Sequence, residues 1–197
     1  MARDAQQREV YERRIWRLAY LLTGNAPGAA RLADRVLRDQ PRIERLEPAR
    51  LDRTVIQHAR DLPRTTSEAI PDLPAPQGEA AEALRAVLSL PEQPREAWVL
   101  ARVDELEDLH VSRAMDCSKT ASRNHLNAAD AQMASRFAGD ALRPARALRA
   151  FADSLDPGRI IRAHRQERRT RAVRRAAVVA SVALVALLVL ALLLLRM

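Results

Sequence analysis

Residues 108–133, DLHVSRAMDCSKTASRNHLNAADAQM, contain two helix-forming segments separated by the tripeptide Asp116-Cys117-Ser118. Ser118 can cap the second helix, whereas Asp116 and Ser118 disfavour continuation of the first. The second segment places four residues on one inward face at helical spacing, namely Ser122, Leu126, Ala129 and Met133. This pattern is typical of a helix-turn-helix, although any two packed helices with a three-residue turn share it.

The outward side of the second segment carries the candidate DNA-binding residues. In a helix-turn-helix the first turns of the second helix enter the major groove. Four polar side chains lie away from the inward face, and we expect them to contact DNA: Lys119, Arg123, Asn124 and Asn127. Because only two of them are cations, we expect weak binding with a modest salt dependence.

Two further helices are predicted before this motif. The first ends at Leu90-Pro91, and a longer one follows Pro94. Their apolar faces are formed by Leu84, Val87 and Leu88 in the first helix and by Val99, Val103 and Leu106, with Trp98 beside them, in the second. Together with the helix-turn-helix they predict a four-helix domain at residues 81–135.

A proline-rich stretch separates this domain from the N-terminal part of the chain. Residues 64–80 read RTTSEAIPDLPAPQGEA, a composition that cannot continue a helix and predicts a linker at 63–80. Before it, three amphipathic helices are expected at 8–22, 27–39 and 48–61. Their apolar positions are Ile15, Leu18, Ala19 and Leu22; Ala29, Leu32, Ala33 and Val36; and Leu51, Val55, Ala59 and Leu62. Residues 1–62 are therefore predicted to form a small helical bundle.

The last part of the chain is predicted to be a helical stem and a membrane anchor. A helix is expected at 137–158, with Ala147, Phe151 and Leu155 on its apolar face, within a stem at 136–175. Residues 176–195, AAVVASVALVALLVLALLLL, contain no charge and as a helix would span roughly 30 Å, the thickness of a bilayer core. This composition predicts a transmembrane helix; a buried core or oligomer helix is the alternative.

Positive charge before the predicted span sets its expected orientation. Residues 159–175 hold eight arginines and one acid, which predicts a cytoplasmic N-terminal part at the inner membrane. Six of these arginines are expected at the anionic membrane surface: Arg165, Arg168, Arg169, Arg171, Arg174 and Arg175. A solvated charge run is the alternative interpretation of the same residues.

The net charge of +8 comes from this stem and not from the N-terminal part. Residues 1–158 hold 24 basic and 24 acidic residues, whereas 159–197 hold 9 basic and 1 acidic. The single Cys117 permits no internal disulfide and fits a reducing compartment. No phosphate loop, metal spacing or nucleophile elbow occurs, so we expect neither an enzyme nor a cofactor.

The order of these elements resembles the sigma-70 family of RNA polymerase sigma factors, in the extracytoplasmic-function type. The resemblance covers about residues 8–135 and rests on two stretches. They are IWRLAYLLTGNAPGAARLADRVLR, beginning at Ile15, and LSLPEQPREAWVLARVDELEDLHVSRAMDCSKTASRNHLNAADAQM, beginning at Leu88. The resemblance implies an all-α fold of two small bundles, the second ending in the helix-turn-helix. It also implies that the first bundle docks on core RNA polymerase and the second on promoter DNA.

The chain departs from the family pattern at several positions. In the helix that grips the polymerase, Ala30, Arg31 and Asp34 replace the usual Glu-Asp and Gln. No aromatic residue lies between positions 38 and 62, where flipped promoter bases would need stacking platforms. Four acids are also expected to crowd the approach to the helix-turn-helix: Asp104, Glu105, Glu107 and Asp108.

Two functions are compatible with these observations. The first is a membrane-tethered, sigma-factor-like transcription regulator that binds core RNA polymerase, promoter DNA or both. The second is a sigma-like interaction module that binds an anti-sigma-like or other membrane protein and does not read DNA. A DNA reader needs accessible cations around Lys119 and Arg123, whereas a partner module needs an exposed apolar patch.

Overall fold

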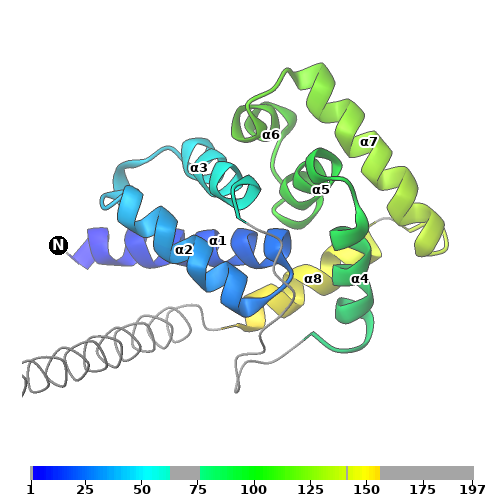
Figure 1. Cartoon of the computed structure of the whole chain (residues 1–197), viewed down its shortest axis with the longest axis horizontal. Helices are drawn as coiled ribbons and strands as arrows, with labels where there is room; N and C mark the ends of the chain where they lie inside the picture. Colours follow the sequence, from blue (N-terminus) through cyan, green and yellow to red (C-terminus); the bar gives the residue numbers. More distant parts are fainter. Residues whose placement is uncertain (1, 63–75, 141, 156–197) are drawn as a thin grey trace, which may run out of the picture. The chain divides into compact units, whose positions relative to one another are not determined.

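All regular structure is helical in the part of the chain that the computed structural model describes, residues 2–62, 76–140 and 142–155 (Figure 1). This finding confirms the predicted all-α class for that part, which lies within one compact unit, 1–161. The elements in chain order are α1 (Ala2–Thr23), α2 (Ala26–Asp39), the 3-10 turn η1 (Ile43–Arg45), α3 (Pro48–Arg60), α4 (Gly78–Ser89), α5 (Glu92–Trp98), the π-helical turn η2 (Val99–Val103), α6 (Asp108–Met115), α7 (Lys119–Arg136) and α8 (Arg143–Ser154).

Local signals place the junction between α1 and α2 where the sequence predicts it. Gly24 follows α1 with φ of +74°, a conformation that favours glycine. The Asn25 side chain then accepts a hydrogen bond of 2.7 Å from the Gly28 N–H and caps α2, whose first turn contains Pro27. The predicted apolar faces of α1 and α2 are confirmed as fully or almost fully buried, and that of α3 is buried at Leu51 and Val55.

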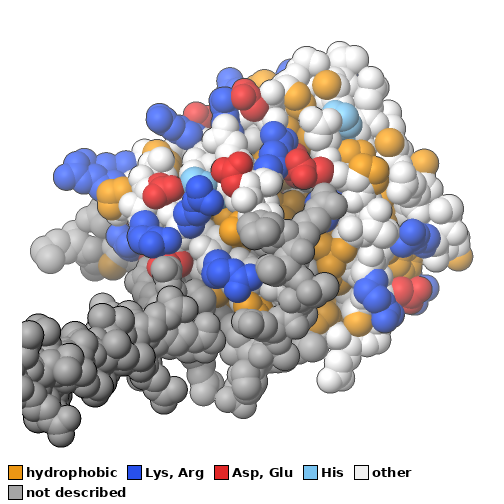
Figure 2. All heavy atoms as spheres, in the orientation of Figure 1, with side chains coloured by type: hydrophobic (Ala, Val, Ile, Leu, Met, Phe, Trp, Pro, Cys, Tyr) orange, Lys and Arg blue, Asp and Glu red, His pale blue; other side chains and the backbone are white. Residues whose placement is uncertain are grey.

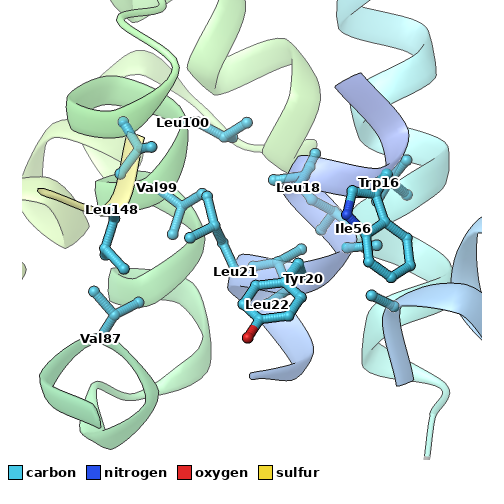
Figure 3. Close-up of a cluster of buried hydrophobic side chains, with 14 of the residues drawn as sticks. Trp16, Leu18, Tyr20, Leu21, Leu22, Ile56, Val87, Val99, Leu100 and Leu148 are labelled. Carbon is cyan, nitrogen blue, oxygen red and sulfur yellow. The ribbon is translucent and has the colours of Figure 1, made fainter. Parts of the chain in front are cut away.

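Helix α1 lies at the centre of the hydrophobic core, and its side chains pack against other elements on more than one of its sides (Figure 3). Figure 3 shows Leu18 and Leu21 lying between Trp16 and Ile56 on one side and Val99 with neighbouring apolar residues on the other. Helix α1 contacts α2 and α3, and also α4 and η2. The core of the described residues is therefore continuous across the predicted linker.

Helix α5 and the turn η2 differ from the prediction in two ways. Pro94 lies inside the first turn of α5, where its missing N–H costs no hydrogen bond, and does not precede the helix. The helix then widens into η2, where the Asp104 N–H bonds to the Val99 carbonyl at 3.0 Å. Glu105 follows with φ of 53°, so Leu106 lies beyond the helix and was wrongly placed on it.

Helix α8 is shorter than predicted, and its inward face is rotated. Ala145, Leu148 and Ala152 are buried. Of the predicted face residues, Leu155 is buried as expected, whereas Ala147 and Phe151 are only half-buried. On the same helix, Arg149 donates hydrogen bonds to the carbonyl oxygens at the end of η2. Apolar spacing alone carries no information about such a contact.

Several predicted segments lie outside the described residues. These are most of the linker at 63–80, the stem beyond residue 155 and the span at 176–195. Among the described helices, none combines the length and the apolar character needed to cross a bilayer. The transmembrane helix and the division into domains at 1–62, 63–80, 81–135, 136–175 and 176–195 stay predictions.

Candidate nucleic-acid interface

The reversal between α6 and α7 is made by three residues, each with a defined local role. Asp116 adopts the left-handed conformation, with φ 57° and ψ 46°, and ends α6. The Cys117 N–H bonds back to the Ser112 carbonyl at 3.0 Å. The extended Ser118 then caps α7, because its hydroxyl oxygen accepts the Ala121 N–H at 3.1 Å. These contacts confirm the predicted cap and fix the direction in which α7 leaves the turn.

The predicted inward face of α7 is also confirmed. Ser122, Ala129 and Met133 are buried, and Leu126 is half-buried against the same core. The Ser122 hydroxyl donates to the Lys119 carbonyl at 3.0 Å, so this buried polar group is satisfied within the helix. Helix α7 packs on α5 and α6, which leaves its opposite side toward solvent.

All four predicted DNA-binding side chains are exposed: Lys119, Arg123, Asn124 and Asn127. The structure brings them together on the outward side of the first half of α7, where base edges and phosphates are contacted in a helix-turn-helix. Their role in DNA binding stays a prediction.

The two cations on this helix differ in their surroundings. Arg123 Nε lies 2.6 Å from Asp108 Oδ2, and both side chains are exposed. An exposed pair of this kind contributes about 0–1 kcal/mol, so an incoming phosphate can replace the carboxylate at low cost. Lys119 makes no ion pair with any described residue.

Two of the four acids expected to crowd the approach to α7 are engaged elsewhere, so that expectation was wrong in part. The Asp104 side chain is fully buried and lies against Arg17. Glu105 pairs with Arg149 on α8 at 2.6 Å. Among the four acids, only Asp108 contacts a predicted DNA-binding residue.

A polar groove adjoins the start of α7. Its volume is about 920 Å³, and α3, α6 and the turn supply most of its walls. The residues that line it are Gln40, Glu47, Ala49, Arg50, Arg53, Thr54, Gln57, Ser112, Arg113, Asp116, Cys117 and Ser118. Two ion pairs cross it, Arg53 to Asp116 at 2.5 Å and Arg113 to Glu47 at 3.4 Å. Figure 2 shows the resulting mixture of basic and acidic side chains over the region of α3 and α6.

Cys117 lines this groove but is not an activated nucleophile. Its thiol is half-buried, and burial raises its pKa although Arg60 acts in the opposite direction. Because the thiolate is the reactive form, a raised pKa keeps this side chain inert near neutral pH.

A second charged cluster lies inside the fold and was missed by sequence reasoning. Asp52 on α3, only 1% exposed, accepts two hydrogen bonds from Arg14, at 2.7 Å from Nε and 2.6 Å from Nη2. Arg17 lies 2.8 Å from Asp104 and 3.1 Å from Asp153, so it joins α1 to the end of η2 and to α8. The position of Arg14 and Arg17 next to the predicted apolar residues Ile15 and Leu18 was the available signal.

Burial dominates the chemistry of Asp104. Asp104 forms a close ion pair with Arg17, but neither of its carboxylate oxygens has a hydrogen-bond partner among the described residues. Desolvation therefore raises the pKa of Asp104, against the attraction of Arg17 and Arg14. The cluster is structural in position, since it lies among α1, α3, η2 and α8.

The predicted membrane-surface residues, Arg165, Arg168, Arg169, Arg171, Arg174 and Arg175, lie outside the described residues. Within the described ranges, no group of histidine, cysteine and acidic side chains could hold a metal ion. No known protein family, curated protein or solved structure matches the chain.

Proposed function

We propose that this chain is a membrane-tethered, sigma-factor-like transcription regulator that binds DNA through α6 and α7. The observation that carries the proposal is the capped three-residue reversal at Asp116-Cys117-Ser118, which presents the exposed side of α7. Core RNA polymerase is the proposed partner of α1 and α2, on the strength of the sequence resemblance in those helices.

The exposed residues of α7 can make two kinds of contact with DNA, to phosphates and to base edges. Lys119 and Arg123 supply positive charge for phosphates, and the amides of Asn124 and Asn127 can each donate to and accept from a base edge. Phosphate contacts fix position on the duplex, whereas base contacts carry sequence information. Affinity is expected to be low because residues 1–158 carry no net charge.

The proposed tether compensates for low affinity by confinement. Each basic residue near an anionic leaflet contributes about 1 kcal/mol, and the eight arginines at 159–175 would hold the domain at the membrane surface. Occupancy of DNA would then depend on polymerase and on local concentration more than on α7 alone.

A second candidate function is a partner-binding module that does not read DNA. It is favoured by the pairing of Arg123 with Asp108, which lowers the positive charge that α7 offers to phosphate. The large apolar side chains exposed among the described residues are Val10, Leu109 and Leu142, at separate places in the chain. Such single residues are normal on a soluble surface, which weighs against a large apolar docking patch.

The test uses the full chain in phosphatidylcholine nanodiscs, with purified core RNA polymerase and labelled genomic DNA fragments. We expect polymerase to be retained by the nanodiscs, and DNA to be retained more strongly when polymerase is present. The double variant Lys119→Ala with Arg123→Ala should retain less DNA than the parent, because it lacks both cations among the predicted DNA-binding residues.

The matched control removes two other exposed arginines, Arg85 on α4 and Arg136 at the far end of α7. This double variant has the same net charge as the test variant and should retain DNA as the parent does. If test and control variants retain DNA equally, α7 is not the reader. Retention of polymerase without DNA would favour the partner module.

A further inference from the structure

We infer that the groove between α3 and the α6–α7 turn is a second phosphate-binding surface, on which the DNA backbone continues beyond α7. The inference rests on the proposed function and names Arg50, Arg53 and Arg113 as its phosphate contacts. None of the three was a candidate in the sequence.

The groove is continuous with the start of α7. Cys117 and Ser118, which lead into α7, form part of its lining, so a backbone strand lying along the first turn of α7 passes over it. Arg50 and Arg53 are three positions apart on α3 and therefore lie on neighbouring parts of one helix face. Arg113 comes from α6, and the three guanidinium groups thus approach the groove from two elements.

The side chains that line the groove carry more positive than negative charge, which favours the binding of an anion. Three arginines line it against two acids, and Arg50 makes no ion pair with any described residue. The Arg53–Asp116 pair is 42% and 56% exposed, and the Arg113–Glu47 pair is 54% and 61% exposed. Exposed pairs of this kind contribute little, whereas an arginine can bind a phosphate through two parallel hydrogen bonds.

The lining also argues for a nucleic-acid backbone and against a free nucleotide. No aromatic side chain lines the groove, so a base would have no stacking platform. The other lining residues are mostly amides and hydroxyls, which suit sugar and phosphate oxygens. A duplex therefore fits the groove through its backbone, without sequence preference.

The salt dependence of binding gives the measurable difference. Each neutralised phosphate contributes about −0.9 to the log–log slope of affinity against salt, so Lys119 and Arg123 alone would give about −2. Adding three groove arginines would bring the contribution of these five residues to about −4.5. Any contribution from the stem is the same in every variant, so differences between variants isolate the groove.

The experiment titrates full-length protein in phosphatidylcholine nanodiscs with a fluorescein-labelled DNA duplex of random sequence, over a range of salt concentrations. Arg50→Ala should make the slope shallower by about 0.9, because one phosphate contact is lost. Arg85→Ala is the matched control, since Arg85 is also exposed and has no ion pair with a described residue, and it should leave the slope unchanged.

A gain-of-affinity variant separates the inference from simple loss of folding. Asp116→Asn removes a groove acid and releases Arg53, while asparagine tolerates the left-handed conformation at this position. We expect this variant to bind the duplex up to about fivefold more tightly at low salt. A damaged fold would weaken binding instead.

The outcomes distinguish this inference from the proposed function. If Lys119→Ala with Arg123→Ala weakens binding but Arg50→Ala and Asp116→Asn behave as the parent, the groove is not a phosphate surface and α7 remains the reader. If the parent binds no better than a variant lacking all five cations, both the groove and the DNA-binding function are wrong.

Discussion

Replacing Asp52 by asparagine should destabilise the fold by about 3 kcal/mol. The Asp52 carboxylate accepts two hydrogen bonds from Arg14 and is 1% exposed, so its removal leaves a guanidinium charge without its main partner. Breaking a buried pair in this way generally costs about 3–5 kcal/mol. We expect the lower end because the Arg14 side chain is 19% exposed and the Asp104 carboxylate also attracts it.

The effect is measured by urea unfolding of the full chain in mild detergent, followed by the fluorescence of Trp16 and Trp98, which are both buried. The midpoint should fall while the dependence on urea stays the same, since the folded state buries the same surface. Because single domains are stable by about 5–15 kcal/mol, a loss of this size is easily resolved.

Two control variants test the cause of the loss. Glu9→Gln breaks the exposed pair with Arg13, which lies at 2.8 Å, and should cost well under about 1 kcal/mol. Arg14→Met together with Asp52→Leu replaces both charges by apolar groups and should recover most of the lost stability. The explanation is refuted if the free energy of unfolding of Asp52→Asn lies within about 1 kcal/mol of that of the parent, or if the double variant is no more stable than Asp52→Asn.

Four further predictions concern single features. Burial raises the pKa of Asp104, so the contribution of this group to stability is full below its unfolded pKa and is lost as pH rises through its folded pKa. The free energy of unfolding of the parent should therefore fall relative to that of Asp104→Asn as pH is raised from strongly acidic to neutral. A difference that stays constant with pH would contradict this. Ser118→Ala removes the cap of α7 and should cost about 1 kcal/mol in urea unfolding, whereas an unchanged midpoint would show that the cap contributes nothing. Gly24→Ala should lower stability by at least about 1 kcal/mol, because φ is +74° and the new Cβ would clash with Leu88 Cδ1. A variant as stable as the parent would exclude strain at this turn. A reporter that works only outside the cytoplasm should be active when fused to the C-terminus, and activity only of a cytoplasmic reporter would overturn the predicted orientation.

The sequence predicted those parts of the fold that depend on neighbours in the chain. The buried faces of α1 and α2 follow from apolar residues at helical spacing, and the α6–α7 turn follows from the capping residue Ser118. Both signals are contained within a few residues. The outward position of Lys119 and Arg123 follows from the same periodicity, once the inward face is known.

The remaining features depend on partners far apart in the sequence. Arg60 on α3 makes two hydrogen bonds, of 2.8 and 2.6 Å, to the buried Glu96 on α5, and no local pattern predicts this pairing. Asp104 was expected on the surface because charged residues usually lie there, but η2 turns it toward Arg17. The groove was missed for the same reason, since α3 and α6 meet only in three dimensions.

The attachment of α8 determines how the described fold would respond to tension from its C-terminal side. Arg149 donates to the Val103 carbonyl at 2.7 Å and the Arg102 carbonyl at 3.0 Å, and Asp153 binds Arg17 one turn later. Asp153 lies near the end of α8 beside the buried Ala152 and Leu155, whereas Arg149 lies in its middle, so a pulling force would act on these polar contacts and on the apolar core together. Because η2 leads directly into the segment before α6, the part of such a force that Arg149 carries would reach the α6–α7 pair through two hydrogen bonds to the η2 backbone.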